Sequence, residues 1–208
     1  MSDAAQTHWE RVYTTRPSTQ VSWYQGEPGR SLAMFAAAGV APTASVIDVG
    51  GGASLLVDRL LDQGYGQISV LDVSSQALAA AKARLGGRGD SVAWLVEDIT
   101  NWSPPPRAFD LWHDRAVFHF LVEDVHRQAY LRALNQGLRV GGHLILATFA
   151  LSGPERCSGL PVQRYSPETL QAVLGGGFQR LDASFETHIT PSGVAQDFVW
   201  CLFRKTAD

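Results

Sequence analysis

Residues 109–121, FDLWHDRAVFHFL, join an apolar run to a cluster of ionisable side chains, a combination that is typical of active sites. The run suits a buried strand and leads directly into His113, Asp114 and Arg115. Left unpaired in an apolar interior, such groups would cost roughly several kcal/mol each, so they must pair or face a cavity. The pKa of a free histidine is about 6.5, which suits a general base at neutral pH, and Asp114 would orient that base or attract a cationic substrate.

A second candidate site is the run DVGGGAS at residues 48–54, where a strand is expected to turn into a helix. Its glycines would let a ligand approach the backbone, and the N-terminus of the helix would offer free N–H groups. A nicotinamide-dinucleotide loop would need a third glycine where Leu55 stands, and no Gly-Lys-Ser/Thr of a nucleotide triphosphatase loop follows. The run therefore indicates either another kind of ligand site or a tight turn without a ligand.

Three carboxylates accompany the glycines at the ends of successive predicted strands. Asp48 lies in the first strand, Asp72 ends the second, and Asp98 follows the third together with Ile99. A carboxylate at the position of Asp72 can accept hydrogen bonds from both hydroxyls of a ribose. Asp98 suits an adenine amino group, and Ile99 suits packing against the ring. Open α/β sheets bind ligands at the carboxyl ends of their strands, which is where all three carboxylates fall.

The elements that must position these residues alternate between short Val, Ile and Leu runs and helical patterns, which predicts an α/β fold with a parallel sheet. We expect strands at 45–50, 68–73, 92–97, 109–114 and 143–150, and helices near 54–63, 75–85 and 123–138. Ser166 and Pro167 begin a shorter helix that ends at Gly175. The runs at 178–187 and 195–205 flank PSG, which predicts a closing antiparallel hairpin.

Composition restricts the class of protein. With 208 residues, 45% of them apolar, the chain suits a single large domain. Its formal charge of −3 gives no long-range attraction to nucleic acid or to an acidic membrane surface. The first residues lack the pattern of a signal peptide and no apolar run is long enough to span a membrane, so we expect a cytoplasmic protein. Cys157 and Cys201 are too few for a disulfide framework or a cysteine-rich metal site.

Taken together, these motifs resemble the class I S-adenosylmethionine-dependent methyltransferases, in particular their small bacterial members, over roughly residues 44–204. The run at 48–52 matches the family pattern of an acidic residue, x, Gly, x, Gly, and Ser54 stands where the family usually has a third small residue. The run GLRVGGHLIL at 137–146 matches the Leu-Lys-Pro-Gly-Gly turn before strand five. Val140 replaces the proline, a departure that concerns the stiffness of the turn.

The resemblance implies a fold, a cofactor and its contacts. The fold would be a Rossmann-like, seven-stranded, mostly parallel sheet with a C-terminal antiparallel hairpin and helices on both faces. The cofactor would be S-adenosylmethionine and the product S-adenosylhomocysteine, with Asp72 on the ribose, Asp98 and Ile99 on the adenine, and the glycines on the methionine half. The expected cofactor contacts are Asp48, Gly50, Gly51, Gly52, Ser54, Asp72, Val73, Asp98, Ile99, His113, Trp23 and Tyr24.

The resemblance also divides the chain into an N-terminal lid, residues 1–43, and a cofactor-binding domain, residues 44–208. The segment 8–30 is polar but carries four aromatic residues, which would cover the cofactor and part of the acceptor pocket or would only anchor a terminal helix. Aromatic faces near a sulfonium also stabilise its charge.

In this family the end of strand four lies beside the transferred methyl group, so the ionisable cluster would face the reaction cavity. His113 and Asp114 are the expected catalytic residues, and the alternative is that His113 is a satisfied histidine bonded to Asp114. Arg115 and His119 are acceptor-side candidates that a structural pair of Arg115 with Asp114 or Glu123 would equally explain. We expect no metal, although His113, Asp114 and His119 are ligand types. The loop at 151–168 adds the acceptor-side candidates Arg156, Cys157, Arg164 and Tyr165.

Three functions remain open. Methyl transfer to a small molecule is favoured because only a short lid and one modest loop surround the site. Transfer to a protein lysine is the alternative, since the glycine motif also resembles the methyltransferases of elongation factors and citrate synthase, although WHDRAVFHF departs from their pattern. The third is a cofactor-binding regulatory module without catalysis. Nucleic-acid methylation is disfavoured by the charge and by the missing Asn/Asp-Pro-Pro-aromatic motif after strand four.

Overall fold

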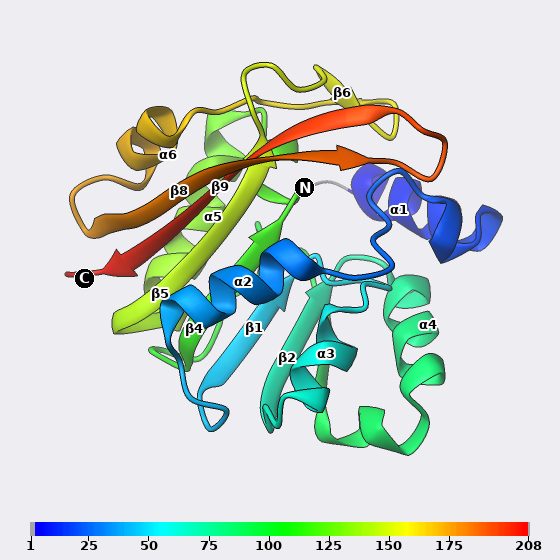
Figure 1. Cartoon of the computed structure of the whole chain (residues 1–208), viewed down its shortest axis with the longest axis horizontal. Coiled ribbons are helices and arrows are strands. Elements are labelled where there is room, and N and C mark those ends of the chain that lie inside the picture. The colour runs from blue at the N-terminus through cyan, green and yellow to red at the C-terminus, as the bar shows by residue number, and fades with distance from the viewer. Residues whose placement is uncertain (1–2, 208) are drawn as a thin grey trace.

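A computed structural model describes residues 3–207 of the chain, and it contains a seven-stranded sheet with helices on both faces (Figure 1). The strand order is β3-β2-β1-β4-β5-β9-β8, in which β1 pairs in parallel with β2 and β4, and β9 runs antiparallel to both β5 and β8. The strands are β1 (Ser45–Val49), β2 (Gln67–Asp72), β3 (Ala93–Val96), β4 (Phe109–Arg115), β5 (Leu138–Phe149), β8 (Phe178–Ile189) and β9 (Ala195–Lys205). The predicted fold, including the final hairpin, is confirmed.

The strand order reverses between β1 and β4. From β1 the chain adds β2 and β3 on one side of the sheet, and from β4 it adds β5 on the other side. Ligands of open α/β sheets bind outside the carboxyl ends of the strands at such a switch point. The register pairs Asp48 with His113 and Val49 with Asp114 across the two strands. The glycine run and the ionisable cluster, which are separated in sequence, therefore meet at the same edge of the sheet.

Two hydrophobic clusters, one on each face of the sheet, hold the helices. On one face lie α2 (Gly29–Ala38), α3 (Leu56–Asp62) and α4 (Ser75–Leu85), which contribute residues such as Phe35, Leu60 and Leu78. On the other face lie α5 (Asp124–Gly137) and α6 (Pro167–Leu174), which contribute residues such as Leu134 and Leu170. Within the described part of the chain, no helix has the length and apolar character needed to cross a membrane.

Several predicted helix ends are confirmed by their capping contacts. The side chain of Ser74 accepts a hydrogen bond from the Ala77 amide, and Ser166 forms a capping box with Thr169. Helix α3, predicted to begin near residue 54, begins at Leu56. The Ser54 hydroxyl accepts a hydrogen bond from the Leu56 amide, and Ser54 itself lies before the helix. Strand β5 begins earlier than predicted, at Leu138, because the chain is already paired with β4 there.

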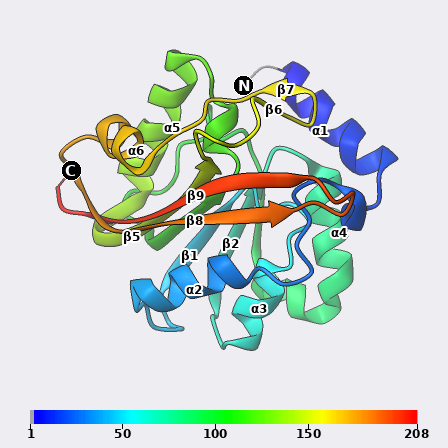
Figure 2. The same ribbon diagram turned by 45° about the horizontal axis from the view of Figure 1, so that its top comes forward.

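The N-terminal segment has two structural roles. Helix α1 (Asp3–Thr15) and a 3-10 turn (Ser18–Gln20) lie at the carboxyl ends of the strands, beside the small hairpin of β6 (Arg156–Cys157) and β7 (Leu160–Pro161) (Figure 2). Helix α2 instead buries its apolar face against the sheet. Within the described part of the expected lid, α1 and the 3-10 turn therefore lie over the strand ends, whereas α2 belongs to the helical layer; residues 1 and 2 of the lid lie outside the described residues.

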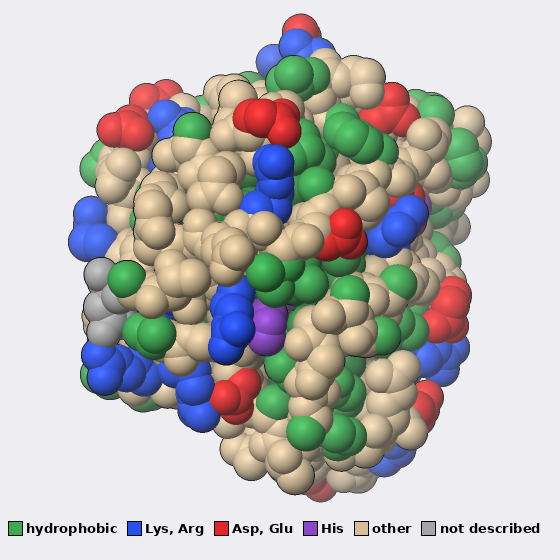
Figure 3. Space-filling view, turned by 60° about the vertical axis from the view of Figure 1, so that its left-hand side comes forward, with side chains coloured by type: hydrophobic (Ala, Val, Ile, Leu, Met, Phe, Trp, Pro, Cys, Tyr) green, Lys and Arg blue, Asp and Glu red, His purple; other side chains and the backbone are tan. Residues whose placement is uncertain are grey.

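Charged side chains are dispersed on the face of the molecule shown in Figure 3, where lysine and arginine alternate with aspartate and glutamate. Exposed ion pairs in the described part of the chain include Arg88 with Asp62 and Arg59 with Glu27. Pairs of this kind contribute little to stability, roughly 0–1 kcal/mol each.

Candidate active site

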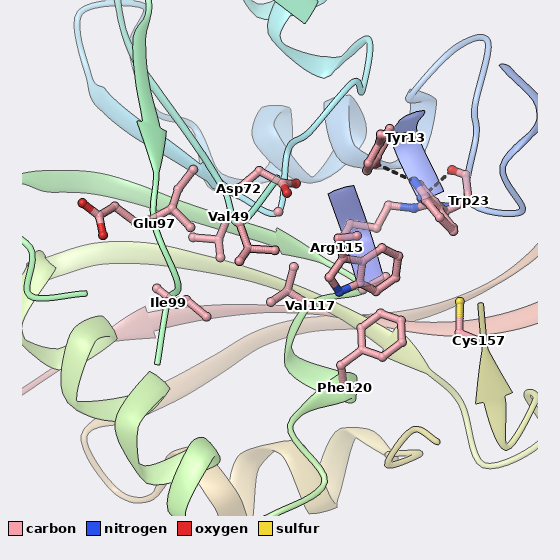
Figure 4. Close-up of a pocket in the computed structure, with 15 residues that line it drawn as sticks. Tyr13, Trp23, Val49, Asp72, Glu97, Ile99, Arg115, Val117, Phe120 and Cys157 are labelled. Atoms are coloured by element: carbon pink, nitrogen blue, oxygen red, sulfur yellow. Dashed lines mark hydrogen bonds between the residues drawn. The ribbon is translucent and has the colours of Figure 1, made fainter. Parts of the chain in front are cut away.

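A cavity of about 660 Å³, the open space at its mouth included, lies at the carboxyl ends of β1, β2 and β4. Helix α1 and the loop that follows it form its cover (Figure 4). The wall consists of Trp9, Tyr13, Trp23, Val49, Gly50, Leu71, Asp72, Val73, Glu97, Ile99, Arg115, Ala116, Val117, Phe120 and Cys157.

The glycine loop forms one edge of this cavity, and two of its positions accept no side chain. Gly50 has φ +70°, and a Cβ there would lie 2.0 Å from Cγ2 of Val117. Gly52 has φ +44°, and a Cβ there would lie 2.9 Å from both the Asp72 carboxylate and the Tyr13 hydroxyl. Positive φ is costly for any residue with a Cβ. The loop therefore presents bare backbone to the cavity, as a ligand cradle requires.

Asp72 supplies the carboxylate at the end of β2. Its Oδ1 accepts a hydrogen bond from the Ser74 amide at 2.8 Å, and the side chain lies in the cavity wall. Burial, together with the negative charges of Asp48 and Glu10, raises the pKa of Asp72 to about 7. A buried carboxylate with this pKa gains from hydroxyl donors, because they stabilise its charged form.

The end of β3 differs from the prediction. Ile99 lines the cavity as expected, but its acidic neighbour in the wall is Glu97, which the sequence analysis missed. Oδ1 of Asp98 accepts hydrogen bonds from the amide and hydroxyl of Thr100, at 2.9 and 2.8 Å. Asp98 thus shapes the turn that presents Ile99, and the expected place of its side chain in the wall is not observed.

His113 is not positioned as the expected base. Its Nδ1 lies 2.7 Å from Oδ1 of Asp48 and its Nε2 lies 3.0 Å from Oγ of Ser31, so both ring nitrogens are engaged. The residue is 2% exposed and borders only a second, smaller cavity beside the glycine loop. His113 is therefore a satisfied histidine, as the alternative held, but its partners are Asp48 and Ser31 rather than Asp114.

Asp114 lies on the opposite face of the sheet, because successive strand residues alternate in direction. Its carboxylate is fully buried and accepts hydrogen bonds from the amides of Val117 and Phe118. Burial raises the pKa of Asp114 to about 6. The side chain of Asp114 thus holds the turn after β4 and does not line either described cavity, which differs from the position expected of a catalytic residue.

Arg115 reaches the cavity, but it lacks both of the ion-pair partners that were expected. One guanidinium nitrogen donates to the carbonyl of Trp23 at 3.0 Å, and the group lies 4.9 Å from the ring centre of Phe198. Its Nε and Nη2 atoms are buried without a hydrogen-bond partner among the described residues. The expected pairing with Asp114 or Glu123 is wrong, because Asp114 points to the other face.

His119 lies in the core rather than at the site. It has no exposed surface, its Nδ1 accepts a hydrogen bond from the Phe149 amide at 3.3 Å, and burial lowers its pKa to about 3. Within residues 3–207, no group of three or more possible ligand side chains is placed to hold a metal ion.

The loop after β5 contributes one residue to the cavity, Cys157, and burial raises the pKa of this thiol to about 11. The other three candidates stabilise the loop or the core. Arg156 donates to the carbonyl of Gly159, and Arg164 donates to the carbonyls of Leu151 and Gly153. Tyr165 is 3% exposed and packs against Phe118.

The match to known proteins agrees with this geometry. Residues 46–142 match the family model described as a methyltransferase domain. The predicted resemblance to the class I S-adenosylmethionine-dependent methyltransferases is confirmed over this part of the chain. S-adenosylmethionine is accordingly its cofactor.

Two curated relatives of this methyltransferase differ in what their names say they act on. An N-terminal Xaa-Pro-Lys N-methyltransferase 1 from Ailuropoda melanoleuca is 29% identical over 106 residues, which cover 50% of this chain and 47% of the relative. A tRNA U34 carboxymethyltransferase from Shewanella woodyi is 31% identical over 126 residues, which cover 58% of this chain and 36% of the relative. The chain thus spans about half or less of the curated relatives it matches.

Solved structures share the fold of this methyltransferase over nearly its whole length. A protein described by the conversion of a disulfide bond into a thioacetal group in echinomycin biosynthesis has a TM-score of 0.80 at 18% identity, covering 97% of this chain and 93% of its own. The N-methyltransferase NodS from Bradyrhizobium japonicum, solved with S-adenosylhomocysteine, has a TM-score of 0.73 at 17% identity, and the match covers 98% of this chain and 99% of NodS.

The cover of the methyltransferase site is aromatic. Trp9 packs edge-on against Trp23 and Phe120, with ring centres 5.4 and 5.1 Å apart, and the Trp23 indole donates to the Tyr13 hydroxyl. Tyr24 lies in the wall of the second cavity instead. Trp9 and Phe120 were not among the expected contacts, although Trp9 stands four residues before Tyr13 and thus on the same face of a helix.

A single glutamate joins this cover to the cofactor-binding domain of the methyltransferase. Oε1 of Glu10 accepts a hydrogen bond from the Ser75 amide at 2.7 Å, and Oε2 accepts from the Ser74 hydroxyl and the Gln76 amide at 2.9 and 3.2 Å. Glu10 therefore caps the N-terminus of α4 from a different helix, where a negative charge is favourable.

Proposed function

We propose that this protein transfers a methyl group from S-adenosylmethionine to a small-molecule acceptor by in-line displacement. The observation that carries the proposal is the covered cavity that has Asp72 and Ile99 at one end and Arg115, Trp23 and Cys157 at the other (Figure 4). A cavity closed over by aromatic side chains suits a compact acceptor better than a folded protein surface.

The cofactor end has the chemistry that S-adenosylmethionine requires. In this proposal the Asp72 carboxylate accepts the ribose hydroxyls, and Ile99 and Val73 pack against the adenine. The bare backbone of Gly50 lies along the methionine half. Asp48 and His113 hold the loop from beneath: a Cβ on Gly51 would lie 2.6 Å from the Asp48 carboxylate.

The bound cofactor supplies an electrophilic methyl group on a sulfonium. The protein has to align the acceptor with it and exclude water, which is the work of Trp9, Trp23 and Phe120. The titratable groups described at that end are Tyr13, Arg115 and Cys157. Burial raises the pKa of Tyr13 and raises that of Cys157 to about 11, and it lowers that of Arg115 only to about 10, so all three stay protonated at neutral pH. None of them is a base, so the proposal favours an acceptor atom that needs no proton removed before attack.

A protein amine is the second candidate acceptor, because the name of the Ailuropoda melanoleuca relative gives an N-terminal Xaa-Pro-Lys substrate. One observation disfavours it here. The charged side chain at the acceptor end is the guanidinium of Arg115, which would repel a lysine or N-terminal ammonium.

The test is transfer of label from methyl-labelled S-adenosylmethionine into a cell extract that has been divided by ultrafiltration. We expect label in the low-mass fraction, and none with Asp72→Asn. Asp90→Asn, at an exposed aspartate away from the cavity, is the matched control and should transfer label normally. Label in the high-mass fraction alone would favour a protein acceptor. Binding of S-adenosylhomocysteine without transfer in either fraction would favour a regulatory module.

A further inference from the structure

Arg115 is a half-buried residue at the acceptor end of the cavity, and its guanidinium forms no ion pair among the described residues. Glu186 and Asp48 act on its charge only from beyond ion-pair distance, and two of its nitrogens are buried without a hydrogen-bond partner. A buried charge of this kind is normally paired. Something that binds in the cavity is therefore the natural partner.

We propose that Arg115 binds a carboxylate carried by an aromatic acceptor, an assignment that rests on the proposed methyl transfer and adds the substrate class. A guanidinium fork matches a planar carboxylate with two parallel hydrogen bonds, and Arg115 has its Nε and Nη2 atoms left for this purpose. The remaining guanidinium nitrogen, Nη1, donates to the Trp23 carbonyl and so fixes the orientation of the group.

The surrounding rings select the rest of the acceptor. Trp9 and Phe120 line the cavity beside Arg115, and both rings are held by edge-on contacts rather than by stacking on each other. Aromatic rings pair preferentially edge-on or offset, so a planar acceptor ring would pack against the cavity side of this pair, whose own ring centres are 5.1 Å apart. The same walls offer little to a sugar or a polar chain.

The charges in the cavity are separated along its length. The acidic residues Asp72 and Glu97 lie toward the cofactor end, whereas Arg115 lies with Cys157 and Trp23 toward the other end (Figure 4). The cofactor also carries a carboxylate, and the Gly50 and Gly51 amides of the glycine loop already donate to the Leu71 carbonyl. We assign the guanidinium to the acceptor because it lies at the end of the cavity away from Asp72 and Glu97, and the experiment separates the two sources.

The experiment is calorimetric titration of the protein saturated with S-adenosylhomocysteine, using two matched pairs of probes: benzoate with benzamide, and phenylacetate with phenylacetamide. At least one acid should bind the native protein about tenfold or more tightly than its amide, since only the acid can pair with the charged fork. Arg115→Met should lose this preference and Arg115→Lys should keep part of it. Arg156→Met is the matched control, because Arg156 is exposed on the neighbouring loop, and it should bind as the native protein does.

Titration with S-adenosylhomocysteine alone comes first and reports on the proposed function by itself. If the native protein does not bind it, the proposed function fails before any acid is added. A loss of about tenfold or more in this binding for Arg115→Met would assign the charge to the cofactor carboxylate and overturn the inference. Equal binding of acids and amides, or no binding of either acid, would overturn it as well.

Discussion

At the scale of single residues, burial determines what each ionisable group of the site does. His113, Asp114 and Arg115 are consecutive, yet their environments differ. His113 is hydrogen-bonded to Asp48, Asp114 accepts hydrogen bonds from amides of the turn after β4, and Arg115 lines the cavity. Strand alternation alone separates Asp114 from its two neighbours, and could have been applied to the sequence. What the sequence does not contain is the partner of His113, because Ser31 lies on a helix far away in the chain.

The binding of S-adenosylhomocysteine should weaken at low pH through Asp72. Burial raises the pKa of this carboxyl to about 7 in the free protein, whereas the ribose hydroxyls require the charged form. Binding therefore releases a proton below that pKa, and the dissociation constant should be about tenfold larger at about pH 6 than at about pH 8. Titrations across this range would show it. In Asp72→Asn binding should be weak and nearly independent of pH, and an equally steep dependence there would assign the titration to another group.

Replacing His113 should destabilise the protein rather than act on chemistry. His113→Ala leaves the buried Asp48 carboxylate without its partner, a loss of about 3–5 kcal/mol and a melting temperature lower by roughly 10 °C. Thermal unfolding measures the effect, with His126→Ala as the control. A variant that melts normally but no longer transfers methyl groups would restore His113 as a catalytic residue.

At the scale of elements, the glycine loop and α1 build the two sides of the cofactor end. Their local signals differ in strength. The strand-to-helix turn at 48–54 is visible in the sequence because glycines and a capping serine mark it. The attachment of α1 to α4 is not visible in the sequence. Glu10 and Ser74 are 64 residues apart, and no local pattern indicates that a glutamate caps another helix.

The glycine loop should not tolerate a methyl group. Gly50→Ala combines a positive φ with a Cβ placed 2.0 Å from Val117, and we expect a loss of about 1–3 kcal/mol in unfolding free energy together with weaker S-adenosylhomocysteine binding. Gly66→Ala is the control, because a Cβ there meets no atom within 4 Å and should change both quantities little. Unfolding in denaturant and calorimetry would report the two effects. Native behaviour of Gly50→Ala would refute the close approach of the loop to Val117.

We propose that Glu10 keeps the aromatic cover closed. Glu10→Ala removes three hydrogen bonds to the N-terminus of α4, so α1 should detach more often and S-adenosylhomocysteine should dissociate faster. The expected increase in the dissociation rate is about fivefold to thirtyfold, from about one to two kcal/mol of lost capping. Stopped-flow fluorescence of the tryptophans in the cover would measure it. Gln6→Ala, at an exposed position on the same helix, should leave the rate unchanged.

At the scale of the whole molecule, the order of elements was predictable and the acceptor was not. Repeated short apolar strands separated by capped helices specify a parallel sheet, and the position of Asp72 at the end of β2 follows from that order. The acceptor end is built from α1, the turn after β4 and the loop after β5. The sequence already indicates Arg115 as an acceptor-side candidate, but its contact with the Trp23 carbonyl and its two unpaired nitrogens arise from segments that are distant in the chain.

The account depends on a single cavity with two chemically different ends, and a crystal structure with bound S-adenosylhomocysteine tests this most directly. We predict that the ribose hydroxyls bond to the Asp72 carboxylate, the adenine packs on Ile99, and the sulfur faces the space between Arg115, Trp9 and Phe120. A ligand bound elsewhere, or one whose sulfur is turned away from Arg115, would contradict the account.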